Sequence, residues 1–250
     1  MADVVGSAPA ARAQEGKNGA VVPSILAFDV NESTLDINHL GPLFQRLFGD
    51  AKVVNEWYAQ LVLYSEAITV AGGPYTPFFN LSRAVLSMMG SVHGVSIKQA
   101  DYDELAMLSS TMPPHPDVPA GLKQLKDAGF KLVTLTNSSA DSQVIQLKNA
   151  GLDGYYDRLF SVDGVRRYKP APQVYHMVAE EMKVTTSSIC LISVHVWDNL
   201  GAQNAGCASA LIARPGNTPP PRLDIPGWPV PSAYGPDLPS VATQLIKLWR

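Results

Sequence analysis

The sequence is short of cysteine, of charged residues and of long apolar runs. Only two cysteines, Cys190 and Cys207, occur among 250 residues, and their spacing is not that of a metal site. We expect both to be buried, reduced thiols, which suits a reducing compartment and a cytoplasmic location. No apolar run approaches the roughly 18 residues of a transmembrane helix, so the sequence predicts no membrane span.

The charge of the chain also argues against nucleic acid as a partner. Charged residues make up 16% of the chain, and the formal net charge is −3. Nucleic-acid binding relies on a concentrated basic face, and the sequence contains no cluster of lysine and arginine of that kind. We therefore expect no nucleic-acid partner. A hydrophobic content of 46% is typical of a globular protein.

Strand-like and helix-like segments alternate from residue 24 onward. Apolar strands are predicted at residues 24–28, 131–135, 189–194 and 208–213, with helical patterns between them. This alternation indicates an α/β fold with a Rossmann-like parallel sheet. The preceding residues, 1–22, lack periodicity and are rich in small residues, which predicts a disordered N-terminal extension.

The segment from 40 to 116 interrupts the alternation. Its pattern is helical, and the proline-rich run at its end predicts a rigid hinge. An insert directly after the first strand indicates a helical cap over the carboxyl ends of the strands, where open parallel sheets bind ligands. We therefore expect an α/β core made of residues 23–39 and 117–250, and a cap made of residues 40–116.

Four segments of the chain end or bend at polar residues. The segments carry Asp29 and Ser33, then Thr136 and Asn137, then Lys169 and Tyr175, and finally Ser193, His195 and Asp198. A single polar residue after a strand is commonly a turn or cap residue. Four such segments in one chain predict a shared site at one edge of the sheet.

With these motifs in this order, the chain resembles the haloacid dehalogenase (HAD) superfamily, and within it the type II 2-haloacid dehalogenases. The matching residues are Asp29 with a hydroxyl four positions later, Thr136-Asn137, Lys169-Pro170, and Trp197-Asp198 with Gly201-Ala202. The resemblance covers residues 24–245. It implies a HAD-like fold with an inserted cap, a short 2-haloalkanoic acid as the substrate, and a homodimer.

The resemblance also implies a mechanism. Asp29 attacks the α-carbon of the substrate and expels halide, giving an ester that water then hydrolyses. Lys169 keeps the Asp29 carboxylate ionised by charge pairing. Asp198 orients either Lys169 or the water, and Ser33 supplies the hydroxyl of the first motif.

Four further positions match residues of the family site. The resemblance implies that Thr136 and Asn137 donate hydrogen bonds to the substrate carboxylate. Tyr175 and Ser193 also occupy family positions, but core packing explains Tyr175 equally well, and Ser193 fits a satisfied strand hydroxyl.

Most members of the superfamily are Mg²⁺-dependent phosphatases, which is the main alternative. Such a phosphatase has a second aspartate two residues after the nucleophile to protonate a basic leaving group. Here Asn31 stands at that position, so we assign it to the substrate site instead, and a halide needs no such acid. Val194 stands four residues before Asp198, where an acidic metal ligand is usual, and it offers no oxygen to Mg²⁺. These residues favour metal-free chemistry without a cofactor.

A phosphatase with a degenerate metal site and a non-catalytic relative that binds a small anion stay open as alternatives. Two departures near the nucleophile bear on the choice. Glu32 replaces the usual glycine before the motif hydroxyl, and His195 replaces an asparagine. For His195, a structural role and the activation of water stand as equal alternatives.

The third departure lies in the cap. Trp57 and Tyr64 keep the spacing of the tryptophan and tyrosine of the family, but Tyr58 replaces the arginine that binds the departing halide. A phenol donates a hydrogen bond yet is a weaker anion partner than guanidinium. Trp57 and Tyr58 either line an apolar substrate pocket or only pack the cap.

Overall fold

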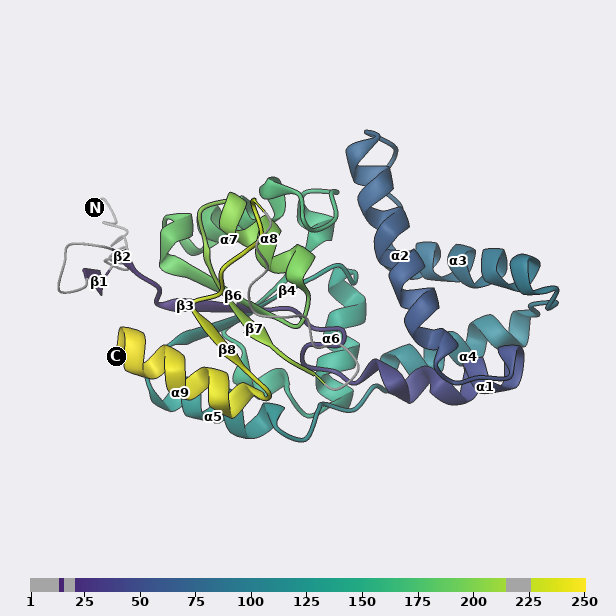
Figure 1. The fold of residues 1–250 in the computed structure, drawn as a ribbon, viewed down its shortest axis with the longest axis horizontal. Coiled ribbons are helices and arrows are strands. Elements are labelled where there is room, and N and C mark those ends of the chain that lie inside the picture. Colours follow the sequence, from purple (N-terminus) through teal and green to yellow (C-terminus); the bar gives the residue numbers. More distant parts are fainter. Residues whose placement is uncertain (1–13, 16–20, 215–225) are drawn as a thin grey trace, which may run out of the picture.

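The computed structural model describes residues 14–15, 21–214 and 226–250 (Figure 1). The predicted disorder of residues 1–22 therefore falls mostly outside the described residues. Within them, Gln14–Glu15 (β1) pairs antiparallel with Val21–Val22 (β2), so these four residues have regular structure where we expected none.

A parallel sheet forms the core of the described chain. Its strands lie in the order β5-β4-β3-β6-β7-β8. Their bounds are β3 Ile25–Phe28, β4 Lys131–Thr136, β5 Arg158–Ser161, β6 Ile189–Ser193, β7 Ala208–Ile212 and β8 Ala233–Gly235. The four predicted strands are confirmed, with ends shifted by at most one residue, whereas β5 and β8 were not predicted.

Helices cover both faces of this sheet. Helices α5 (Val118–Asp127) and α9 (Leu238–Trp249) lie together on one face, and α7 (Pro172–Met182) and α8 (Val196–Asn204) lie on the other (Figure 1). Helix α6 (Ala140–Asn149) contacts the edge strand β5. Because the sheet is covered on both sides, the central strand β3 is apolar throughout, and all four of its residues are buried.

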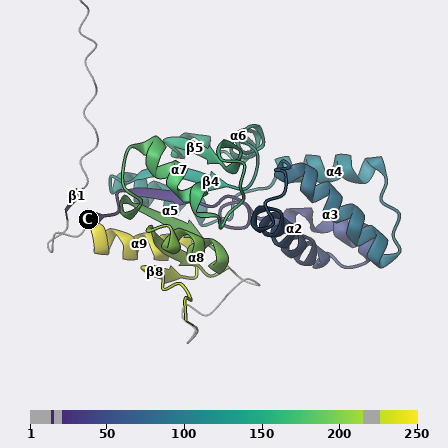
Figure 2. The same cartoon turned by 90° about the horizontal axis from the view of Figure 1, so that it is seen from above.

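Four helices stand beside the sheet rather than on it (Figures 1 and 2). They are α1 (Gly41–Phe48), α2 (Val53–Val70), α3 (Phe78–His93) and α4 (Gln99–Ser110), entered through a short 3-10 turn at Ile37–Leu40. They fall inside the segment predicted to be a cap, whose exact boundaries at residues 40 and 116 stay a prediction. No helix in the described ranges has the length and hydropathy needed to cross a bilayer.

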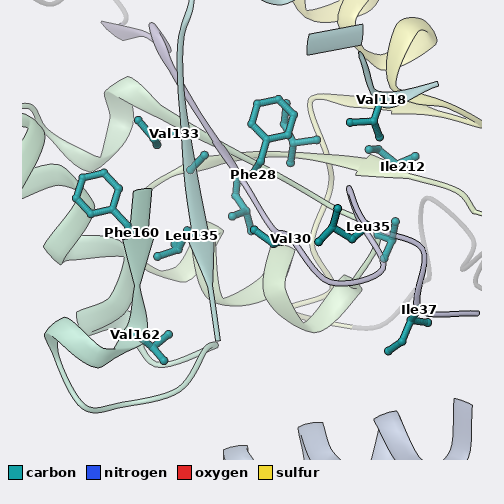
Figure 3. Packing of buried hydrophobic residues seen from close by; sticks show 14 of the residues in the cluster. Phe28, Val30, Leu35, Ile37, Val118, Val133, Leu135, Phe160, Val162 and Ile212 are labelled. Atoms are coloured by element: carbon teal, nitrogen blue, oxygen red, sulfur yellow. The ribbon is translucent and has the colours of Figure 1, made fainter. Parts of the chain in front are cut away.

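The order of the strands creates a crevice beside β3. After β3 the chain next forms β4 on one side, and only later β6 on the other, so the loops after β3 and β6 separate at the carboxyl edge. Ligands bind at such switch points in open parallel sheets. The apolar residues Val30 and Leu35 point into the core close to Phe28 and anchor the loop after β3 (Figure 3).

Candidate active site

Asp29 lies at the switch point, directly after β3. Its backbone N–H donates to the carbonyl oxygen of Ile192 on β6 at 3.0 Å, which fixes the start of the loop. One carboxylate oxygen, Oδ2, accepts a hydrogen bond of 2.5 Å from Ser33 Oγ, and Oδ1 accepts one of 2.7 Å from Lys169 Nζ. Both oxygens of this buried carboxylate are therefore held in place.

Lys169 connects the first and last motifs. Its fully buried ammonium group lies 2.7 Å from Asp29 Oδ1 and 2.6 Å from Asp198 Oδ2, and it also donates to the carbonyl oxygen of Leu135 at 3.0 Å. Burial by itself lowers the pKa of Lys169, but the two carboxylates outweigh it and raise that pKa above its ordinary value. The ammonium group therefore stays charged and balances two negative charges.

Tyr175, on α7, completes the surroundings of Asp198. Its hydroxyl donates to Asp198 Oδ1 at 2.7 Å, while Oδ2 is bound by Lys169. Burial raises the pKa of Tyr175 well above its usual value, so the phenol stays a neutral donor. Both oxygens of Asp198 are thus occupied by side chains, and its contacts orient Lys169.

Two serines join the loops after β3 and β6. The hydroxyl of Ser33 accepts from the Val194 backbone N–H at 3.1 Å and lies 3.4 Å from Ser193 Oγ, which itself accepts from the His195 N–H at 3.0 Å. These contacts fix both loops relative to Asp29, the buried partner of Ser33.

His195, at the start of α8, lies against Asp29. Its Nε2 lies 3.5 Å from Asp29 Oδ2 and 3.5 Å from Glu32 Oε2, and it is buried without a hydrogen-bond partner. The imidazole stacks on Trp197, with ring centroids 4.9 Å apart, and on Tyr58 of the cap at 5.9 Å. The structure thus places His195 in the site.

The second motif lies on the other side of the crevice. Thr136 Oγ1 accepts from the Ser138 backbone N–H, and Asn137 Oδ1 accepts from the Lys169 backbone N–H, both at 3.1 Å. Asn31 Nδ2 donates to Ser138 Oγ at 3.2 Å, and its buried Oδ1 has no partner. These contacts leave the Thr136 hydroxyl hydrogen and the Asn137 amide N–H groups free to donate elsewhere.

The three aromatic residues of the predicted cap differ in location: Tyr58 lies at the site, Trp57 mainly in the core of the cap, and Tyr64 at the surface. Tyr58 lines two cavities, an apolar one of about 170 Å³ and a polar cleft of about 960 Å³. Trp57 lines the smaller cavity, but it also packs on Phe44 and donates to the Ser82 carbonyl oxygen at 3.1 Å, as a core residue does. Tyr64 is 40% exposed and lines neither cavity.

The loop after β3 is held by residues to which the sequence analysis gave no role. His115, in the hinge segment, has its Nε2 2.9 Å from the carbonyl oxygen of Glu32. Arg214 Nη2 donates to the carbonyl oxygen of Ser33 at 2.9 Å, and its Nη1 binds Asp117. His115 is 83 positions from Glu32 in the sequence, and Arg214 is 181 positions from Ser33. No local pattern in the sequence connects residues so far apart.

Comparison with known proteins identifies the family. Residues 25–206 match the haloacid dehalogenase-like hydrolases, so the chain belongs to this family of hydrolases, as the motifs predicted. An (S)-2-haloacid dehalogenase of Pseudomonas sp. (strain YL) is 27% identical over 208 residues, which are 83% of this chain and 90% of that protein.

Solved structures confirm the fold. An L-2-haloacid dehalogenase of Xanthobacter autotrophicus with chloropropionic acid covalently bound superposes with a TM-score of 0.79 at 22% identity, covering 89% of this chain and 98% of that one. A defluorinating L-2-haloacid dehalogenase gives a TM-score of 0.76 at 25% identity, covering 94% and 99%. The predicted α/β fold of the HAD type is therefore correct.

Proposed function

We propose that this protein is a hydrolytic dehalogenase of short 2-haloalkanoic acids that works through an ester at Asp29 and needs no metal ion. One observation carries the proposal. The Asp29 carboxylate is fixed at both oxygens, by Ser33 and by Lys169, at the carboxyl edge of the sheet beneath the cap. A carboxylate held in this way is preorganised as a nucleophile, and the relatives named as 2-haloacid dehalogenases support a haloacid as its target.

In the first half of the reaction, an oxygen of Asp29 bonds to the α-carbon of the substrate as the carbon–halogen bond breaks and the halide leaves. The donors available on the opposite side of the crevice, the Thr136 hydroxyl and the Asn137 amide, suit the substrate carboxylate. In the second half, water attacks the carbonyl carbon of the ester, and a 2-hydroxy acid leaves as the Asp29 carboxylate is restored.

The contacts of Asp198 support metal-free chemistry. In a two-carboxylate metal site, oxygens of both residues bind the cation. Here Lys169 Nζ lies between Asp29 and Asp198, and Tyr175 occupies the other oxygen of Asp198. Within the described residues, no group of three histidine, cysteine or acidic side chains is placed to hold a metal ion. The ammonium group of Lys169 thus supplies the positive charge that a phosphatase obtains from Mg²⁺.

Two assays on the same preparation test this function. We expect halide release from 2-chloropropionate or 2-bromopropionate that is unchanged by an excess of chelator, because no step uses a metal ion. We expect no release of phosphate from a generic phosphoester, with or without Mg²⁺. Phosphate release that depends on Mg²⁺ without halide release would establish the phosphatase instead, and silence in both assays would favour an anion-binding relative.

Tyr58 is the proposed partner of the departing halide. Burial, together with the negative charges of Asp29 and Glu32, raises the pKa of Tyr58 well above its usual value, so the phenol stays a neutral donor beside the nucleophile. We expect Tyr58→Phe to lower kcat/KM for halide release by about tenfold, the effect of one lost hydrogen bond to an anion. Stopped-flow detection of halide measures it.

Tyr64→Phe is the matched control for Tyr58→Phe. Both residues lie on α2, but Tyr64 is exposed and lines neither cavity, so its variant is expected to keep the activity of the native protein. Equal activity of the two variants would remove Tyr58 from the proposed role.

A further inference from the structure

Glu32 and His195, the two departures from the family pattern in the core, meet beside the nucleophile. The Nε2 atom of His195 lies 3.5 Å from Asp29 Oδ2 and 3.5 Å from Glu32 Oε2. Both distances are longer than a direct N–H···O hydrogen bond, and Nε2 is buried with no other partner. A ring nitrogen without a partner, next to the reacting carboxylate, needs an explanation.

Glu32 is held in an unfavourable backbone conformation. Its φ is 62°, in the left-handed region that glycine adopts without strain, and a non-glycine residue stays there only when its surroundings fix it. Two contacts hold this backbone conformation: His115 Nε2 lies against the carbonyl oxygen of Glu32, and Arg214 donates to the carbonyl oxygen of Ser33. The loop therefore tolerates strain that a glycine avoids, and it presents a carboxylate to His195.

The orientation of His195 is also fixed. Its ring stacks on Trp197 with an interplanar angle of 19° and on Tyr58 with one of 29°. Two carboxylates, of Asp29 and Glu32, face Nε2, and the phenol of Tyr58 beside the ring stays neutral. The ammonium group of Lys169 is bound to Asp29 and Asp198.

We propose that Glu32 and His195 form an acid-base pair that activates water for the hydrolysis of the ester at Asp29. In this pair His195 is the catalytic residue, since it exchanges protons with the reacting groups. Glu32 is a positioning residue, because its carboxylate orients the imidazole and stabilises its protonated form. The inference rests on the proposed ester mechanism. Both side chains line the polar cleft of about 960 Å³, which gives water a route to the ester.

Two proton transfers at His195 accompany the hydrolysis of the ester. His195 Nε2 takes a proton from water as the water oxygen bonds to the Asp29 carbonyl carbon, and a tetrahedral oxyanion forms. The oxyanion collapses, the bond from the Asp29 carbon to the substrate oxygen breaks, and the imidazolium returns its proton to that oxygen. The 2-hydroxy acid leaves. The second proton of the water leaves Asp29 for solvent, which restores the carboxylate paired with Lys169.

His195→Asn tests the catalytic residue in the full-length protein. With 2-bromopropionate we expect a burst of one bromide per active site, followed by turnover about 10²- to 10⁴-fold slower than in the native protein. Mass spectrometry of acid-quenched protein is expected to find the ester on the peptide that carries Asp29. Because only the second step slows, kcat and KM fall together and kcat/KM is unchanged.

Glu32→Gln tests the positioning residue and removes charge with little change of shape. We expect a smaller loss of kcat, with the ester again detectable in the steady state. The pH profile of kcat changes as well, since a neutral amide replaces the charged group beside the imidazole. This variant tests the pair even where His195→Asn does not fold.

His176→Asn is the control, since His176 is an exposed residue of α7, and its kinetics are expected to match those of the native protein. Slow bromide release in His195→Asn without accumulated ester would overturn the proposal and assign His195 to the first step. An unchanged pH profile without ester in Glu32→Gln would overturn the role of Glu32. Failure of the native protein to release halide would refute the dehalogenase function itself, so the two failures are distinguishable.

Discussion

Replacing Asp29 by asparagine is expected to lower kcat for halide release by more than about 10⁴-fold, the scale of losing a nucleophile. The amide keeps the shape of the carboxylate and its contact with Ser33, but it lacks the charge that attacks carbon. Lys169 keeps one carboxylate partner, Asp198, so we expect the variant to fold. Steady-state halide release, with circular dichroism to verify the fold, measures the effect.

Asp127→Asn is the control for this variant, since Asp127 is an exposed residue at the end of α5 and its replacement is expected to leave kcat unchanged. A single turnover of the native protein in heavy-oxygen water provides an independent check: the label is expected in the Asp29 carboxylate, because water attacks that carbon. Turnover of Asp29→Asn close to that of the native protein, or label found only in the hydroxy acid, would contradict an ester at Asp29.

Lys169→Met is expected to have the largest effect on stability. The substitution leaves the buried carboxylates of Asp29 and Asp198 without their shared cation, and breaking a buried ion pair in this way costs about 3–5 kcal/mol of the free energy of unfolding. Turnover is lost as well, because the carboxylates then repel each other and favour protonation. Urea denaturation monitored by fluorescence measures the change in stability.

The stability loss of Lys169→Met depends on pH in a defined direction. Burial raises the pKa of Asp198 and Lys169 opposes that rise, so the variant loses the opposing charge. A carboxyl group whose pKa is higher in the folded than in the unfolded state favours folding at low pH, and this contribution is lost as the pH rises. We therefore expect the stability loss to be smaller at pH 5 than at pH 7.

Lys123→Met separates this effect from a general loss of charge. Lys123 is an exposed residue whose ion pair with Asp127 lies at the surface, where solvent screens the charges, so the pair contributes little to stability. A stability loss in Lys169→Met no larger than that of Lys123→Met would show that the buried ammonium group does not balance the two carboxylates.

The strands that the sequence predicts are those buried on both faces. Residues 25–28 and 189–192 form continuous apolar runs because helices cover both sides of the sheet. The strands that the sequence analysis missed lie at its edges. The β5 segment, Arg158–Ser161, has only two apolar residues between polar ends, and β8, Ala233–Gly235, is three residues long inside a proline-rich stretch. Neither contains a local pattern that distinguishes it from a loop.

For Asp198 and His195 the sequence left two roles open, and local pattern could not distinguish between them. The motif around Asp198 allowed a contact with either Lys169 or water, and only the fold places both its oxygens on Lys169 and Tyr175. His195 allowed a structural or a chemical role, and only the fold places its Nε2 within 3.5 Å of Asp29.

The sequence by itself determined the alternating architecture and predicted Asp29 as the nucleophile. Apolar periodicity specifies which segments are buried, and the motif around Asp29 follows a strand whose residues are all buried. The tertiary structure alone decided what surrounds the carboxylate. Glu32 and His195 are 163 positions apart, and they meet because β3 and β6 are neighbours at the switch point of the sheet. Contacts over such separations depend on strand order and backbone conformation, which no local pattern of residues encodes.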